Sequence, residues 1–190
     1  MRDKKKVFAS LFIAFIMIFS IFGFLLGYSL NDLEVVYKNY KFVETPQGWL
    51  SVIDGERFFF IYTPEIVEDL LADDVKNVLN NANKITITQD PSKFYTPVIT
   101  DFVLELSENI PKIKNVEFDF GLINNSKYNL PKITCENAST ENIVLFFNES
   151  ETETNSSITF NNNCVSVNYA DQVELYQQKE AIYFALLGVI

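Results

Sequence analysis

The sequence predicts an α/β or α+β fold, with one N-terminal transmembrane helix followed by a single domain in which about three helices cover a mixed β-sheet. Three observations support this prediction. Residues 7–28 contain no charged side chain. Beyond them, β-rich segments alternate with helix-periodic ones, and no repeat or low-complexity linker divides the chain. We therefore expect a cytoplasmic basic tail at 1–6, an anchor at 7–28 and an extracytoplasmic domain at 31–190.

The composition limits the classes of function. The chain has 190 residues, 15 of them basic and 25 acidic, with two cysteines and no histidine. Four basic residues and one acidic residue precede residue 31, so the rest of the chain carries a net charge of −13. This acidity argues against a nucleic-acid partner, because no basic patch neutralises phosphates. Without histidine, Ser-His and Cys-His catalytic pairs are excluded, and we expect no cofactor and no metal site.

The apolar run has the length of a membrane span. Its 22 residues extend about 33 Å as a helix, against a hydrocarbon core of ~30 Å. The basic residues before it should stay cytoplasmic, which predicts a single-pass cell-membrane protein with its C-terminal domain outside. A cleavable signal peptide is the alternative, although its apolar core is usually only ~7–15 residues long.

Small residues share one face of this predicted helix. Ser20, Gly23 and Gly27 lie on that face, and the two glycines have the GxxxG spacing that lets helices approach closely. The pattern favours a transmembrane homodimer or contact with an envelope protein partner. Alternatively, the spacing is a chance feature of an apolar segment.

Segments rich in β-branched and aromatic residues predict the strands. They lie at residues 35–43, 49–53, 57–62, 84–88, 116–120, 142–147, 157–160 and 165–169. Asp54-Gly55 predicts a tight hairpin between the second and third segments, and Asp90-Pro91 closes the fourth. We expect segments 142–147 and 157–160 to form a hairpin around an acidic loop.

Three segments have helical periodicity with start or stop signals. Thr63-Pro64 fits the N-cap and first position of a helix that reaches about residue 80. An apolar stripe over residues 98–110 predicts the second helix, which Pro111 ends. Asp171 caps the last helix, which has one apolar face, and Gly188 fits its C-terminal stop.

Cys135 and Cys164 both fall in the predicted outer domain. An oxidising compartment makes a disulfide between them the expected state. The bond would enclose 28 residues. A metal site or a redox pair is the alternative. Two thiols without histidine are, however, a poor ligand set for zinc, and the spacing of the two cysteines is not the CxxC of a redox pair.

Four Asn-x-Ser/Thr triplets are candidate glycosylation sites. They begin at Asn124, Asn137, Asn148 and Asn155, on the predicted outer side of the membrane. Alternatively, they follow from an Asn-rich composition.

Carboxylates are the remaining candidates for catalysis. Asp101, Glu105 and Glu108 share the polar face of the second helix, and Glu117 and Asp119 share one side of a strand. Two carboxyls about 5–10 Å apart, one with a raised pKa, could hydrolyse a glycan. A carboxylate stripe on an amphipathic helix is, however, typical of a solvated face. We therefore expect the three helix carboxylates to face water, and we assign no catalytic residue.

A run of acidic residues and the single tryptophan are each interpreted as structural features and not as binding sites. Glu149, Glu151 and Glu153 form a run in a predicted loop, but they lack the ligand ladder and glycine of an EF-hand, which favours a solvated loop. Trp49 lies in an apolar strand and is expected in the core, with a sugar-stacking platform as the alternative.

Three stretches resemble a family of short archaeal proteins of unknown function that are anchored by a single membrane pass. They are KITITQDP at Lys84–Pro91, NNNCVSV at Asn161–Val167 and AIYFALLGVI at Ala181–Ile190. The family has a basic start and one span, followed by an outer domain with a cysteine-bounded hairpin and a helix ending in Leu-Gly. The resemblance implies a membrane-anchored architecture and brings no activity or ligand.

Together these features favour a non-catalytic binding or assembly module, anchored in the lipid bilayer and displayed outside the cell. An accessory subunit of an envelope membrane complex and a carboxylate-dependent glycan hydrolase are the alternatives. The expected partners are the bilayer and an envelope protein.

Overall fold

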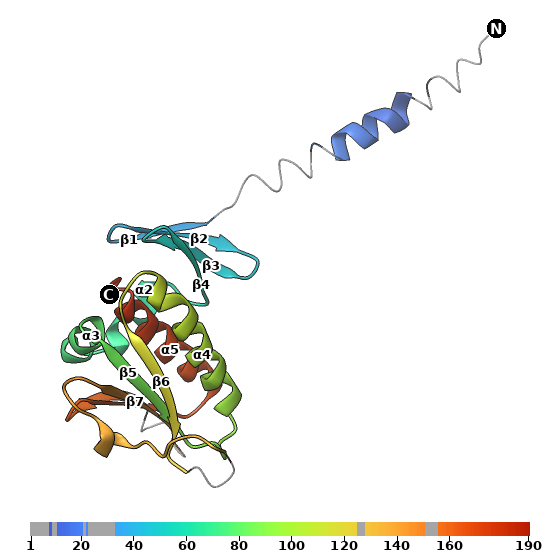
Figure 1. The fold of residues 1–190 in the computed structure, drawn as a ribbon. Helices are drawn as coiled ribbons and strands as arrows, with labels where there is room; N and C mark the ends of the chain where they lie inside the picture. Colours follow the sequence, from blue (N-terminus) through green and yellow to red (C-terminus); the bar gives the residue numbers. More distant parts are fainter. Residues whose placement is uncertain (1–7, 9–10, 21, 23–32, 125–127, 151–155) are drawn as a thin grey trace.

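The computed structural model describes residues 8, 11–20, 22, 33–124, 128–150 and 156–190 (Figure 1). The described part of the N-terminal segment is helical, and Ser20 is exposed there. Among the described residues, no helix is both long and apolar enough to cross a bilayer. Both ends of the predicted anchor, together with Gly23 and Gly27, lie outside the described residues.

The fold is α+β and contains two sheets. A four-stranded antiparallel sheet has the order β1 (Glu34–Tyr37), β2 (Tyr40–Thr45), β3 (Gly48–Ile53) and β4 (Glu56–Phe60). A five-stranded mixed sheet has the order β6 (Glu117–Leu122), β5 (Lys84–Gln89), β7 (Ile143–Glu149), β9 (Cys164–Tyr169) and β8 (Ser157–Asn161). The predicted mixed sheet is confirmed. The expectation of one sheet is wrong, because the first four strands pair only with one another.

Tight turns build the antiparallel sheet. Asp54 and Gly55 both have positive φ and form the predicted hairpin turn between β3 and β4. Residues 35–43 are not one strand as expected, since Lys38 adopts φ 51° and reverses the chain between β1 and β2. Gly48 has φ +123°, and a Cβ there would lie 2.4 Å from the Phe60 carbonyl oxygen. Only glycine fits that close approach.

The mixed sheet is parallel except at one edge. β5 pairs in parallel with β6 and β7, and β7 pairs in parallel with β9. The predicted hairpin between residues 142–147 and 157–160 is wrong, because β8 instead turns back onto β9 through Asn162-Asn163. Both asparagines have positive φ, which asparagine tolerates better than most residues. β7 is buried on both faces, as is typical of an interior parallel strand.

Four α-helices lie among the described residues of the domain. They are α2 (Pro64–Val67), α3 (Asp73–Asn80), α4 (Thr96–Asn109) and α5 (Gln172–Leu186), with 3₁₀ turns at Glu68–Leu70, Ile110–Lys112 and Cys135–Asn137. The helix expected over residues 64–80 is divided, because Leu71 is extended. Thr63 occupies the N-cap position, but its side chain makes no capping hydrogen bond. Asp171 does cap α5, accepting from the Glu174 N–H at 2.9 Å.

Helix α5 joins the two sheets into one core. Its Phe184 ring contacts Phe60 and Phe42 of the antiparallel sheet at centroid distances of 4.4 and 5.8 Å. Tyr183 meets Phe58 on that side and Phe102 of α4. Figure 1 shows α4 and α5 between the antiparallel sheet and the mixed sheet. The apolar residues predicted on one face of this helix are buried, and so are all residues from 178 to 186 of α5.

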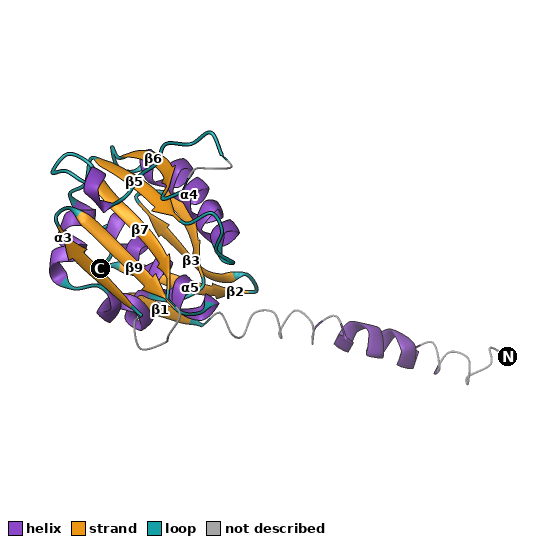
Figure 2. Cartoon of the chain, turned by 90° about the horizontal axis from the view of Figure 1, so that it is seen from below, coloured by secondary structure: helices purple, strands orange, loops and turns teal. Residues whose placement is uncertain are grey.

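Residues 128–142, in the segment between β6 and β7, lie on the other face of the mixed sheet. The Thr88 hydroxyl donates to the Ile133 carbonyl at 2.9 Å. Cys135 in this segment forms a disulfide with Cys164 of β9, with the two Cα atoms 5.3 Å apart, which confirms the predicted bond. In Figure 2 strands β6, β5, β7 and β9 lie side by side with helices around them.

Candidate binding cleft

The main candidate site lies where the parallel strands β5 and β6 end. The chain leaves β5 toward α4, on one face of the sheet, and leaves β6 toward the segment that lies on the other face. Ligands of open parallel sheets bind in such a crevice at the carboxyl ends of the strands. A cleft of about 400 Å³ lies at this place, within the ~300–1,000 Å³ range of small-molecule sites.

The walls of the cleft are largely apolar, with four polar residues. The apolar walls come from Pro91, Pro97, Phe120, Leu122, Tyr128 and Leu130. The polar residues are Gln89, Thr96, Thr100 and Asp101. An apolar enclosure with a few placed polar groups is the usual composition of a site that binds a small molecule.

Gln89 is the most constrained of these polar groups. It ends β5, is only 1% exposed, and its Nε2 donates to the Thr96 carbonyl at 3.4 Å and to the Thr100 hydroxyl at 3.2 Å. These acceptors fix the orientation of the amide, and its buried Oε1 has no hydrogen-bond partner within the described structure. A buried acceptor without a partner costs about 1–3 kcal/mol. Gln89 therefore lines the cleft and carries a buried acceptor without a partner.

The start of α4 leaves few donors for a ligand. The Thr96 N–H donates to the Lys93 carbonyl and the Ile99 N–H to the Tyr95 carbonyl, while Pro97 has no N–H. The exposed Asp101 carboxylate adds a negative charge at this end. The polar groups of the cleft are therefore mainly acceptors, which suit a ligand that donates hydrogen bonds.

A second cleft of about 500 Å³ lies beside the disulfide on the opposite face of the mixed sheet. It is lined by Ile123, Lys132, Thr134, Cys135, Glu136 and Phe146. None of these described lining residues carries a buried polar side-chain atom without a partner. This second cleft therefore lacks, among its described lining residues, the buried unpartnered polar atom that Gln89 carries in the first cleft.

Helix α5 carries a buried cluster of charged groups that the sequence analysis did not identify. Glu180 is 9% exposed, and its Oε1 accepts the Ile61 N–H at 3.1 Å. Burial, with a further contribution from Glu105, raises the pKa of Glu180 to about 8. Lys179 is equally buried, and burial lowers the pKa of its ammonium, which lies 4.9 Å from the centroids of Phe102 and Tyr176. Neither described cleft is lined by these groups.

The carboxylates of α4 differ in their surroundings. Asp101 and Glu108 are exposed, as expected. The expectation that Glu105 faces water is wrong: it is half-buried near Lys179, and burial raises the pKa of its carboxyl. The reason is that α5 packs against this part of α4, where Lys179 and Tyr183 contact the Phe102 ring.

The strand carboxylates lie elsewhere. Glu117 and Asp119 both bind the Lys84 ammonium, at 3.1 and 2.6 Å, on the surface of β6. Glu149 ends β7, whereas Glu151 and Glu153 lie outside the described residues. Within the described structure no three His, Cys, Asp or Glu side chains form a group that could hold a metal ion.

The glycosylation candidates are in different environments. Asn124 and Asn137 are exposed, and the Asn137 Oδ1 accepts the Thr134 N–H at 2.9 Å. Asn148 is half-buried in β7, and its Nδ2 donates to the Asn168 Oδ1 at 3.0 Å. Asn155 lies outside the described residues.

Some of the functional residues that the sequence analysis did not identify had a recognisable signal in the sequence. Gln89 directly follows a strand of β-branched residues, and polar residues at such strand ends often bind ligands. Lys179 and Glu180 precede a stretch that is apolar on every helical face, a pattern that indicates burial all round. No local sequence pattern indicated that the Thr100 hydroxyl would accept a hydrogen bond from Gln89.

No family model, no curated protein and no solved structure matches this chain. The predicted resemblance to membrane-anchored archaeal proteins therefore stays a prediction.

Proposed function

We propose that this protein is a membrane-anchored, extracytoplasmic, non-catalytic binding module whose ligand occupies the cleft at Gln89. The observation that carries the proposal is the apolar cleft of about 400 Å³ at the carboxyl ends of β5 and β6. Its ligand is a small molecule, or a small group on a larger partner, with an apolar body and a hydrogen-bond donor. A donor that reaches Gln89 Oε1 removes the cost of leaving that acceptor without a partner.

The cellular placement is supported by the N-terminal sequence. The uncharged residues 7–28 match the thickness of a bilayer, and the basic tail before them favours a cytoplasmic N-terminus. The disulfide between Cys135 and Cys164 is consistent with an oxidising outer compartment. The domain is then displayed on the outside of the cell membrane.

A carboxylate hydrolase is the second candidate, favoured by the raised pKa of Glu180. It is less well supported because Glu180 lies between α5 and the antiparallel sheet and lines neither described cleft. An accessory subunit of an envelope complex would use the same cleft to hold a group of its partner, and it would co-purify with that partner in mild detergent.

Ligand binding is tested with two matched aromatic probes, benzylamine as the donor and phenylacetate as the acceptor. We expect saturation-transfer NMR on the full chain in detergent to detect benzylamine in the cleft and to detect phenylacetate weakly. Asp101→Asn should weaken benzylamine binding by up to about fivefold, because an ion pair with an exposed carboxylate contributes about 0.2–1 kcal/mol. Gln89→Met should weaken it as well.

Asp73→Asn and Gln47→Met are the controls, since both residues are exposed and lie outside the cleft. Equal binding of the two probes, or equal loss in the control variants, would contradict the assignment of the cleft.

Topology is tested separately on intact cells. Protease added outside should digest the chain beyond about residue 31 after reduction of the disulfide, and it should spare the basic N-terminus. Protection of the whole C-terminal part would contradict the external placement.

A further inference from the structure

The antiparallel sheet has an apolar face that no other described element covers. Side chains alternate along each strand, so one face packs on α5 through Phe42, Phe58 and Phe60. The outer face, as we name it, carries Val36, Val43, Leu50, Val52, Phe59 and Ile61. Val36 is 62% exposed, Val52 57%, and Phe59 and Ile61 49% each. Contiguous apolar patches of this kind mark interaction surfaces.

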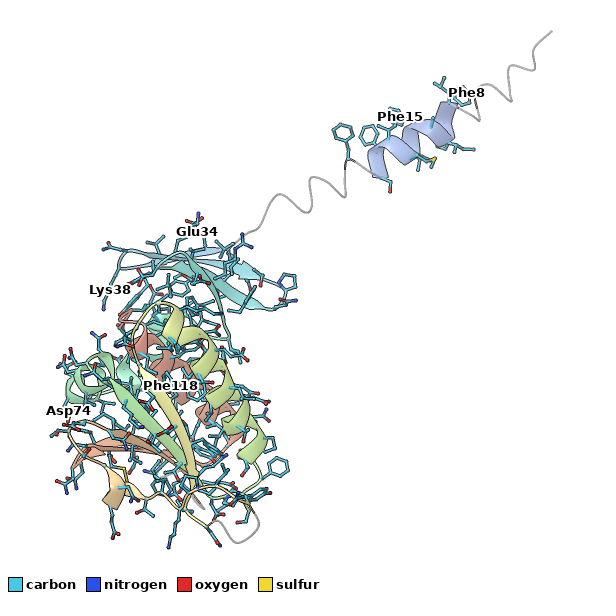
Figure 3. The ribbon with its side chains drawn as sticks, in the orientation of Figure 1. Phe8, Phe15, Glu34, Lys38, Asp74 and Phe118 are labelled. Atoms are coloured by element: carbon cyan, nitrogen blue, oxygen red, sulfur yellow. A yellow bond between two sulfur atoms is a disulfide. The ribbon has the colours of Figure 1, made fainter. Side chains whose placement is uncertain are left out.

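These apolar residues form a continuous row across the sheet. Val43 lies opposite Leu50, and Leu50 lies opposite Phe59, in the registers of β2 with β3 and of β3 with β4. Figure 3 shows Glu34 on the side of this sheet that is turned away from the helices. The row is therefore directed outward and not toward the core.

The charge of the outer face differs from that of the rest of the domain. Lys41 and Arg57 are exposed on it, and Glu34 is bound to the Lys41 ammonium at 2.7 Å. The face thus carries an excess of one positive charge, whereas residues 31–190 as a whole carry −13. A face of this charge on an acidic protein is complementary to an anionic surface.

The connection to the N-terminal segment restricts where this sheet can lie. Only residues 29–33 separate the predicted anchor from β1, which is an edge strand of the sheet. Even fully extended, five residues reach about 18 Å. If the anchor spans the bilayer, the antiparallel sheet is the layer held closest to the membrane surface.

We propose that the outer face of the antiparallel sheet docks on the outer surface of the membrane, on anionic lipid headgroups. The proposal depends on the membrane anchor of the proposed function. The apolar row enters the interfacial region, and Lys41 and Arg57 bind headgroup phosphates. Helix α4 begins at the end of the molecule remote from this sheet (Figure 1), so docking directs the cleft at Gln89 away from the bilayer.

The test places a single tryptophan at different points of the full chain in nanodiscs. Trp49 is the only tryptophan, and it is replaced by Trp49→Phe in every sample. Phe59→Trp then reports the outer face. Phe94→Trp reports the start of α4, where Phe94 is 81% exposed. The nanodiscs contain phosphatidylcholine and phosphatidylglycerol with brominated acyl chains, which quench nearby tryptophan.

We expect brominated lipid to reduce the emission of the Phe59→Trp protein by about half, because its ring lies in the interfacial region. The emission of the Phe94→Trp protein should be unchanged. Replacement of Lys41 and Arg57 by serine, or the removal of phosphatidylglycerol, should reduce the quenching at residue 59.

The outcomes separate docking from anchoring. A chain that co-elutes with the discs while its residue 59 stays unquenched overturns the docking proposal and leaves the anchor intact. A chain that does not co-elute overturns the anchor and docking together. Protection of residue 59 from aqueous iodide without quenching by lipid assigns the face to a second copy or another protein, and this also overturns docking on lipid.

Discussion

Glu180 illustrates how one buried residue can govern the pH dependence of stability. Burial raises its pKa in the folded protein from 4.5 to about 8. Between these pH values the folded state keeps the proton and the unfolded state has lost it. The free energy of unfolding therefore falls as pH rises through this window, by about 1.4 kcal/mol per pH unit. The total loss is on the order of 3–5 kcal/mol.

We predict that Glu180→Gln removes most of this dependence. Glutamine keeps an oxygen to accept the Ile61 N–H and carries no charge to bury. Urea denaturation of the full chain in mild detergent at pH 5 and pH 8 should show the large loss of stability in the native protein and a small one in the variant. Glu105 has a raised pKa of the same origin and accounts for the remainder.

Glu108→Gln is the matched control, because Glu108 is an exposed residue of α4. It should retain the pH dependence of the native protein. A Glu180→Gln protein that loses as much stability between pH 5 and pH 8 as the native chain would contradict a buried, protonated Glu180.

At the scale of elements, the segment between β6 and β7 depends on a few attachments. Thr88 holds it at Ile133, and the disulfide holds it at β9. Gly121 allows the close approach, since a Cβ there would lie 2.3 Å from Ile133 Cγ1. The described residues of this segment contain no long helix or strand, so these attachments, with the backbone hydrogen bonds of Pro131 and Ile133 to Leu122, hold it in place.

We predict that Cys135→Ser combined with Cys164→Ser lowers the free energy of unfolding by about 3–4 kcal/mol, the loop-closure entropy of a ring of this length. Denaturation measures the loss, and hydrogen exchange should locate the faster opening at residues 130–142. Thr140→Ala in the same segment replaces an exposed side chain, leaves the ring closed and should change stability by less than about 0.5 kcal/mol. Unchanged exchange in the double variant would show that the other contacts suffice.

At the scale of the whole molecule, the two sheets share α5. Phe184 packs on Phe42 and Phe60, while Leu175 and Ile182 of the same helix belong to the core that includes the mixed sheet. A buried element that both sheets contact couples their unfolding, because neither sheet keeps its core when α5 leaves.

We therefore predict one cooperative transition. Trp49 fluorescence reports the antiparallel sheet, and a Phe160→Trp, Trp49→Phe protein reports β8 of the mixed sheet. Their denaturation midpoints should coincide. Phe184→Ala should lower the free energy of unfolding by about 3–5 kcal/mol and so lower both midpoints together. Phe94→Ala, at an exposed position, should shift neither midpoint. An earlier transition at Trp49 alone would show that the sheets unfold independently.

The sequence by itself determined the features that depend on neighbouring residues and on periodicity. The Asp54-Gly55 hairpin, the stripe of α4 and the cap of α5 at Asp171 are confirmed because turn chemistry, amphipathic spacing and capping act over a few residues. The pairing of Cys135 with Cys164 was also accessible, since the chain has only two cysteines. Only the tertiary structure decided that β7 pairs in parallel with β9 and not with β8, that the strands divide into two sheets and that Glu105 and Glu180 are buried. Gln89 and Thr100 likewise meet in one cleft only when β5 and α4 pack together. These features depend on contacts between segments distant in the chain, and such contacts leave no periodic pattern in the sequence.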